Sequence, residues 1–303
     1  MLENEKILGL KIDVDTYRGT KYGVPSLLKV LAKHNIKGSF FFSIGPDNMG
    51  RHAWRLLKPK FLKKMLRGNA AKLYGFDIIF KGLLCPGPDI GKKLPNIMKN
   101  AEKEGHEVAL HAYDHYKWQM KISKAALKTS SSMQNTAIKR WNEIFLTPPK
   151  VAGTPGWQLS QAWLDFSENN NFLYRSDSRG NDYGFPTFNG KQYKTLQIPT
   201  TLPTYDETIG KNGIDNSNYN ELILGKIKEN QLNVISIHAE VEGIACKEMF
   251  EDFIIKALRE NIKIVPLVQI YEMVKNNPQT QELRIEEISG REGKLAVLGK
   301  INL

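Results

Sequence analysis

Short runs of β-branched and aromatic residues alternate with longer helical segments along most of this 303-residue chain. This alternation predicts a mainly parallel sheet covered by helices, closed or nearly closed as a (β/α) barrel. Functional side chains of such folds gather beyond the carboxyl ends of the strands. The expected strands are residues 7–14, 38–44, 107–112, 150–153, 172–177, 194–199, 232–238 and 262–268. The expected helices include residues 24–35, 89–105 and 246–261.

Three of the expected strands run into carboxylate or imidazole side chains. The first ends at Asp13-Val14-Asp15, another reaches His111 and the run NVISI reaches His238. His111 and His115 lie four residues apart, so one helical turn would present both to one metal ion. Two histidines and a carboxylate with an open position predict a hydrolytic metal site. The alternative is a chance histidine spacing together with aspartates that form caps or turns.

These residues resemble the motifs of the polysaccharide deacetylase family, the NodB homology domain of carbohydrate esterase family 4. Asp13 and Asp15 match a strand that ends in Asp-x-Asp, and His111-Ala-Tyr-Asp-His115 matches the family's paired histidines. His238 matches an aliphatic strand that ends in histidine. The motifs occur in the family's order, and the resemblance spans residues 7–275. It implies a distorted (β/α) barrel of the NodB-like type, here with a basic amphipathic helical insertion.

Longer stretches are similar to one group within that family, the 4-deoxy-4-formamido-L-arabinose-phosphoundecaprenol deformylases. The resemblance implies metal-dependent hydrolysis of the formamide of an undecaprenyl-phosphate-linked sugar. The products would be formate and a free amino sugar lipid, which serves lipid A modification and resistance to cationic antimicrobial peptides such as polymyxin. The matching stretches are DVDTYRGT (13–20), residues 42–75, SDSRG (176–180), HAEVEG (238–243) and GREG (290–293).

The resemblance also implies a role for each site residue. Asp15, His111 and His115 would bind one divalent metal ion, and this donor set is compatible with Zn, Co, Mn or Ni. Asp13 would be the general base that takes a proton from the attacking water. His238 would be the general acid that protonates the departing amine.

One family motif is incomplete in this chain. The family has an Arg-x-Pro-aromatic motif whose arginine contacts the catalytic aspartate, whereas residues 151–157 read VAGTPGW. Pro155 and Trp157 remain, the arginine is absent, and Gln158 stands where the deformylases have an arginine after Gly-Trp. Arg179 is a candidate substitute, and an ordinary surface arginine is the alternative.

Three further acids lie near the matched motifs. Asp177 could orient His238, as carboxylates commonly orient catalytic histidines. Glu240 and Glu242 follow His238 directly and could receive the amine that forms. For these two glutamates, the alternative is an ordinary solvated loop.

Residues 48–75 contain eight lysines or arginines and no acidic residue, within a chain of formal net charge +11. We expect a barrel over residues 1–278, with 46–95 inserted as a membrane- or lipid-binding segment and 279–303 as a C-terminal tail or edge hairpin. An amphipathic helix packed on the barrel with a solvated basic face is the alternative. The candidate lipid-binding residues are Arg51, Trp54, Arg55, Lys58, Lys60, Phe61, Lys63, Lys64 and Arg67.

Cysteine content and hydropathy bear on location. Cys85 and Cys246 form no disulfide framework, which favours a reducing compartment. We find no secretory signal and no apolar run of membrane-spanning length. The prediction is a peripheral protein on the cytoplasmic side of the inner membrane. Its expected partners are the lipid-linked sugar and an anionic membrane surface, with no nucleic acid and no stable protein partner.

Two other functions remain open from the residues alone. One is N-deacetylation of another polysaccharide or amino sugar by an enzyme of the same family. The other is a basic membrane-binding protein without catalysis, which the insertion alone would permit. The second alternative leaves the aspartates and histidines at the strand ends without a role.

Overall fold

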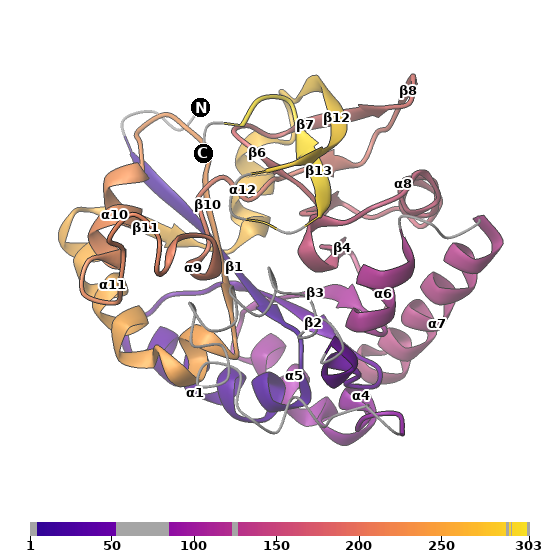
Figure 1. Cartoon of the computed structure of the whole chain (residues 1–303), viewed down its shortest axis with the longest axis horizontal. Coiled ribbons are helices and arrows are strands. Elements are labelled where there is room, and N and C mark those ends of the chain that lie inside the picture. Colours follow the sequence, from indigo (N-terminus) through magenta and orange to yellow (C-terminus); the bar gives the residue numbers. More distant parts are fainter. Residues whose placement is uncertain (1–4, 53–84, 123–126, 289–290, 292, 302–303) are drawn as a thin grey trace.

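The computed structural model describes residues 5–52, 85–122, 127–288, 291 and 293–301 (Figure 1). Their strands form one mixed sheet in the order β10-β1-β2-β3-β4-β5-β9-β7-β12-β13-β6, with β11 paired to β1 and β8 to β7. The strands are β1 (Lys6–Val14), β2 (Ser39–Ser43), β3 (Glu107–Ala112), β4 (Val151–Ala152), β5 (Tyr174–Arg175), β6 (Arg179–Gly180), β7 (Gly184–Phe188), β8 (Lys191–Gln192), β9 (Leu196–Gln197), β10 (Asn233–His238), β11 (Ile262–Val265), β12 (Gln279–Glu287) and β13 (Lys294–Leu298).

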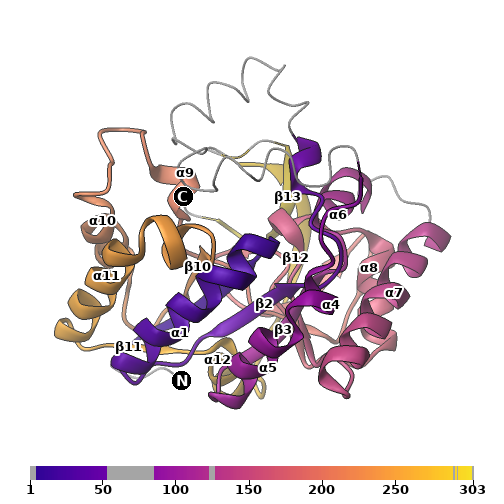
Figure 2. The same ribbon diagram turned by 90° about the horizontal axis from the view of Figure 1, so that it is seen from below.

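Helices surround the strands, as the two perpendicular views show (Figures 1 and 2). The apolar faces of the helices pack on the outside of the sheet, for example through Leu27 and Leu31 of α1 and Phe253 of α11. The helices are α1 (Val24–Lys33), α4 (Ile90–Lys93), α5 (Pro95–Lys103), α6 (His115–Lys121), α7 (Leu127–Phe145), α8 (Gln161–Asn169), α9 (Tyr205–Thr208), α10 (Tyr219–Lys226), α11 (Lys247–Arg259) and α12 (Leu267–Val274).

Strand β1 lies at the centre of the parallel part of the sheet. It pairs in parallel with β10 on one side, and with β11 and β2 on the other. Beyond β9 the chain returns to β10, because the N–H groups of Thr201 and Leu202 donate to the Val234 carbonyl at 3.1 and 3.0 Å. These bonds nearly close the sheet, so the predicted distorted (β/α) barrel is confirmed.

The expected strands and helices occur close to their predicted positions, with two local differences. The predicted helix 89–105 is divided into α4 and α5, because Leu94 leaves the helical conformation (φ −128°) before Pro95 starts the second helix. The strands of the later half of the barrel are shorter than expected, and β4, β5 and β9 each comprise two residues.

The basic insertion leaves the barrel after β2, and its two ends are joined at their base. The Asp47 N–H donates to the Pro88 carbonyl at 3.0 Å, and the Ile90 N–H donates to the Gly45 carbonyl at 2.8 Å. Of the candidate lipid-binding residues, Arg51 is described, whereas Trp54 to Arg67 lie outside the described residues. Within the described part of the chain, no helix is both long and apolar enough to cross a membrane.

The C-terminal segment, expected as a tail or edge hairpin, contributes two strands to the sheet. β12 pairs in parallel with β7 and antiparallel with β13, and β13 pairs with β6 (Figure 1). Leu295 and Val297 of β13 pack against Trp157 in a small apolar cluster. Strands β12 and β13 therefore extend the sheet of the barrel.

His106, in the turn between α5 and β3, supports a prediction about stability and pH. Its Nδ1 accepts the Gly38 N–H at 3.2 Å, and its buried ring meets Phe40 edge-on. Burial, with a smaller effect of Lys37, lowers the pKa of His106 to about 4. Unfolded chains bind this proton near the ordinary value of 6.5, so the folded state loses stability as pH falls from 6.5 towards 4.

We therefore expect the urea midpoint of the wild type to fall more steeply between about pH 7 and 4.5 than that of His106→Gln. The reason is that glutamine keeps a polar side chain but takes up no proton. Urea unfolding followed by circular dichroism at a series of pH values measures the difference. Equal pH dependence of the two midpoints would contradict this account of His106.

Candidate active site

The parallel register of the barrel brings the polar strand ends to one place. Asp13 at the end of β1 lies opposite His238 at the end of β10. On the other side of β1, β2 separates it from β3, which carries His111. Asp15 and His115 follow β1 and β3 by a few residues. The sequence therefore correctly predicted which strand ends meet.

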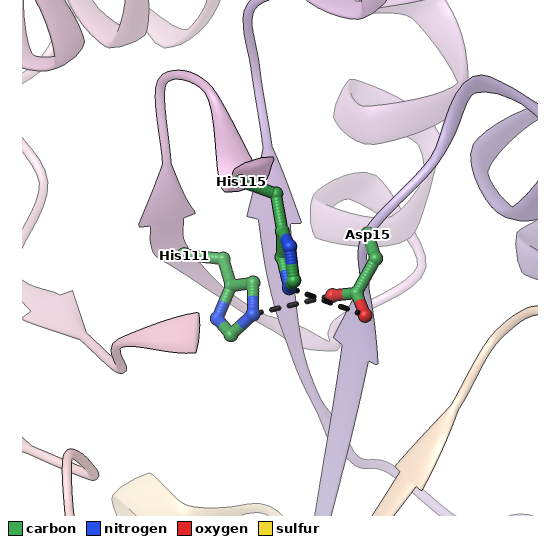
Figure 3. Close-up of side chains that lie close together, drawn as sticks. All are labelled: Asp15, His111 and His115. Atoms are coloured by element: carbon green, nitrogen blue, oxygen red, sulfur yellow. Dashed lines mark ion pairs between the residues drawn. The ribbon is translucent and has the colours of Figure 1, made fainter. Parts of the chain in front are cut away.

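Asp15, His111 and His115 form a compact, buried cluster of ligand atoms (Figure 3). The Nε2 atom of His111 lies 3.2 Å from Asp15 Oδ1, and the Nε2 atom of His115 lies 3.4 Å from Asp15 Oδ2. The three ligand atoms all lie within 4.8 Å of one another. Two imidazole nitrogens and one carboxylate oxygen are a donor set that fits a divalent transition metal and leaves positions for water and substrate.

A hydrogen bond orients the ring of His111, and a helix cap fixes the backbone of His115. The Nδ1 of His111 donates to the Gly153 carbonyl at 2.7 Å, which leaves its Nε2 free to bind a metal. His115 is the first residue of α6, and the preceding Asp114 caps this helix by accepting the Lys117 N–H at 2.9 Å. Asp114 also accepts a hydrogen bond from Asn48 at 2.6 Å, so the base of the insertion supports the helix that carries His115.

The protonation states of the cluster suit metal binding. Burial raises the pKa of Asp15, but the charge of His115 and the hydrogen bond of His111 outweigh it and hold this pKa well below its usual range. Burial lowers the pKa of His115 to about 4, despite the opposing charge of Asp15. At neutral pH the site therefore offers a carboxylate and a neutral imidazole, the forms in which these side chains bind metals.

Asp13 lies next to a residue that sequence reasoning did not identify. Lys11 is fully buried, and its Nζ lies 3.4 Å from Asp13 Oδ1. The same ammonium donates to the Ser176 carbonyl at 3.1 Å and lies 4.8 Å from the centre of the Phe41 ring. A signal was present in the sequence, because a lone lysine two residues before Asp13 in an apolar strand must share its face of the sheet.

His238 is partly buried at the end of β10. Burial lowers its pKa, but the nearby charges of Asp15 and Asp13 outweigh this effect and raise the pKa above its ordinary value. The imidazole is therefore protonated over a wider pH range, which suits a general acid. Its backbone N–H donates to Glu242 at 2.8 Å, which fixes the strand end that carries it.

Glu240 and Glu242 are both buried, which rules out the solvated loop. Oε1 of Glu240 accepts the backbone N–H groups of Asp15 and Thr16 at 3.2 and 2.9 Å and the Thr16 hydroxyl at 2.6 Å. Glu240 thus supports the loop that carries Asp15. Burial raises the pKa of Glu240 to about 8 and that of Glu242 to about 7. A role in receiving the amine stays a prediction.

The structure corrects the expectation for Asp177. Its Oδ1 accepts the Thr154 N–H at 2.9 Å, and its Oδ2 accepts the indole N–H of Trp163 at 2.8 Å. These bonds direct the carboxylate at the loop after β4 and at α8, so Asp177 positions this loop instead of orienting His238.

Arg179 is likewise not the partner of Asp13. Its guanidinium is fully buried and bonds both carboxylate oxygens of Glu207, at 2.7 and 2.8 Å. The Trp157 ring contacts this guanidinium and that of Arg291, at 4.9 and 4.3 Å from the ring. Arg291, in the GREG segment, also binds Asp206 at 2.9 Å and Glu207 at 3.0 Å. Arg291 therefore attaches the C-terminal segment to Trp157 by a cation–π contact and to Asp206 and Glu207 by ion pairs.

Comparison with known proteins agrees with this geometry. The polysaccharide deacetylase family model matches residues 3–156. A curated protein of Shewanella sediminis (strain HAW-EB3), named "probable 4-deoxy-4-formamido-L-arabinose-phosphoundecaprenol deformylase ArnD", is 47% identical over 97% of this chain and 95% of its own. A protein of the same name from Wigglesworthia glossinidia brevipalpis is 42% identical over 93% of this chain and 99% of its own.

Solved structures share the fold at low sequence identity. A Mycobacterium smegmatis protein described as a polysaccharide deacetylase has a TM-score of 0.62 at 16% identity, covering 94% of this chain and 96% of its own. The Bc1960 peptidoglycan N-acetylglucosamine deacetylase has a TM-score of 0.54 at 16% identity, covering 89% of each chain. With the family model, the relatives along nearly the whole chain and the fold in agreement, this protein belongs to the polysaccharide deacetylase family.

Proposed function

We propose that this protein hydrolyses the formamide of undecaprenyl-phosphate-linked 4-deoxy-4-formamido-L-arabinose, releasing formate and the free amino sugar lipid for lipid A modification. The observation that carries the proposal is the Asp15, His111 and His115 cluster, flanked by Asp13 and His238 opposite each other in register. The substrate is supported by relatives that carry the deformylase name over nearly the whole chain.

The residues of the chain divide the proton transfers that amide hydrolysis requires. A divalent metal at Asp15, His111 and His115 would polarise the formyl carbonyl and lower the pKa of a water molecule. Asp13 accepts a proton from the water molecule while the water oxygen forms the new bond to the formyl carbon. His238, held protonated by nearby carboxylates, donates a proton to the nitrogen as the carbon–nitrogen bond breaks. The proton is needed because an unprotonated amine is a poor leaving group.

The native metal is one of Zn, Co, Mn or Ni in this proposal. One carboxylate and two imidazoles bind each of these ions, and affinity order alone does not decide which ion is bound in cells.

We also place the protein at the cytoplasmic face of the inner membrane, where its lipid-linked substrate would be reached. The basic and apolar residues of segment 48–75 support this location. Each lysine or arginine near an anionic surface contributes on the order of 1 kcal/mol before salt screening. At the base of this segment, Asn48 donates a hydrogen bond to Asp114, the residue that caps the helix of His115. A lipid bound to the segment would therefore lie near the reacting groups.

Substitutions within the site should separate metal binding from proton transfer. We expect Asp13→Asn to keep the metal but to lower the rate of formate release by about 100-fold or more, because the base is lost. We expect His111→Ala to lose both metal and activity. Formate release and metal content by mass spectrometry measure the two effects, with His34→Ala as a control histidine outside the site. Unchanged formate release in either site variant would disprove the assignment of that residue.

Substrate choice separates the proposed function from the deacetylase alternative. We expect the wild-type enzyme to release formate from the lipid-linked formamido sugar much faster than acetate from its N-acetyl counterpart or from N-acetylated oligosaccharides. Matched assays with and without the polyprenyl chain measure both preferences. Acetate release from oligosaccharides without formate release would favour the alternative activity.

The basic segment should bind anionic membranes in a salt-dependent manner. We expect Lys63→Gln, Lys64→Gln and Arg67→Gln together to weaken sedimentation with phosphatidylglycerol-containing vesicles, because attraction to the surface charge decreases. Metal content should not change. The matched control replaces three exposed lysines elsewhere, Lys99, Lys103 and Lys226, by glutamine. Equal vesicle binding by both triple variants would argue against a specific role for the segment.

A further inference from the structure

We propose that Lys11 positions Asp13, in the place that the arginine of the Arg-x-Pro-aromatic motif takes elsewhere in the family. The role of Asp13 as base rests on the proposed function, whereas the pairing of Lys11 with Asp13 is a property of the fold. The inference rests on the lack of space for a side chain at Gly153, on the contacts of the Lys11 ammonium and on the ion-pair partners of the other buried cations.

The motif position itself cannot hold a long side chain in this structure. An arginine two residues before Pro155 would replace Gly153. A Cβ atom there would lie 2.8 Å from two atoms of the Phe41 ring and 3.0 Å from the Ser176 carbonyl oxygen. These distances are below van der Waals contact, so Phe41 fills the path along which the arginine would leave the chain.

The Lys11 ammonium contacts the same two groups. Its Nζ donates to the Ser176 carbonyl at 3.1 Å and lies 4.8 Å from the centre of the Phe41 ring. A positive charge is therefore present beside Gly153, but the residue that carries it, Lys11, belongs to β1 and not to the loop after β4. The Phe41 ring thus has two roles. It blocks an arginine side chain at position 153, and it makes a cation–π contact with the Lys11 ammonium.

The strand geometry directs this charge at Asp13. Lys11 and Asp13 are two residues apart on β1, so their side chains leave the same face of the sheet. The Nζ lies 3.4 Å from Asp13 Oδ1, and both side chains are buried. The ammonium donates to the Ser176 carbonyl, lies over the Phe41 ring and forms an ion pair with Oδ1, which accepts no hydrogen bond from the described residues. The charge of Lys11 therefore faces Oδ1, and Oδ2 remains available to accept a proton.

The other fully buried cations near the site have different partners. Arg179 is paired with both oxygens of Glu207. Arg175 lies 3.8 Å from Asp177. Neither substitutes for the motif arginine, so among the residues that the structure describes Lys11 is the fully buried cation paired with Asp13.

Substitution of Lys11 tests the positioning role through activity. We expect Lys11→Met, which keeps the length and volume of the side chain, to lower kcat about tenfold or more while KM and metal content stay near wild type. The matched control is Lys6→Met, the same change on the same strand, at a partly exposed lysine paired with Glu260. A kcat for Lys11→Met within about twofold of wild type, with full metal content, would overturn the inference.

A double-mutant cycle on metal-free protein tests the pairing without any activity. Lys11→Met and Asp13→Asn each leave one buried charge without its partner, whereas the double variant removes both charges. We therefore expect the urea midpoint of the double variant to lie closer to wild type than the sum of the single shifts. If Lys11→Met alone fails to fold, recovery of folding by Asp13→Asn supports the pairing, and failure to recover overturns it. Additive shifts overturn it as well.

These measurements separate the inference from the proposed substrate. If the wild type releases no formate but hydrolyses an N-acetylated sugar, the proposed function fails and the Lys11 comparison is made on acetate release. If the wild type releases formate while Lys11→Met matches it and the cycle is additive, the inference fails and the proposed function stands.

Discussion

The active site depends on the parallel pairing of β1 with its neighbours in the sheet. The register of β1 with β10 places Asp13 opposite His238, and the register through β2 places His111 on the other side of β1. Parallel strands end at the same edge of the sheet, so residues more than 200 positions apart converge without any special loop. A shift of this register by one residue would turn Lys11, Asp13 and their neighbours away from the barrel interior.

Burial of charge is the main physical cost of this arrangement, and the surrounding structure compensates each charge differently. Asp15 is stabilised by two histidines and Asp13 by the Lys11 ammonium. Because the histidines come from β3 and α6 whereas Asp15 follows β1, the compensation of Asp15 depends on the folded barrel. A metal ion would add positive charge where carboxylates are most crowded.

Two segments outside the barrel proper are also attached to the site. The base of the insertion contributes Asn48, which supports Asp114 and hence the helix that begins with His115. The C-terminal segment contributes Arg291, which stacks on Trp157 and binds the carboxylates of α9. A segment expected to be an appended tail or edge hairpin thus contacts an aromatic side chain of a family motif.

The sequence by itself determined the fold class and which polar strand ends come together. Strand and helix periodicities are local properties, and polar residues at the ends of apolar strands predict the meeting of Asp13, Asp15, His111 and His238 whatever the details of packing.

Only the tertiary structure decided the partners of the supporting residues. Sequence reasoning offered Arg179 as a candidate partner of Asp13 and Asp177 as a candidate partner of His238, but these side chains bind Glu207 and the Thr154 loop. The period of a strand tells which side chains share a face, as with Lys11 and Asp13. It does not tell which side chain from another strand lies across the barrel, because that depends on the packing of residues such as Phe41.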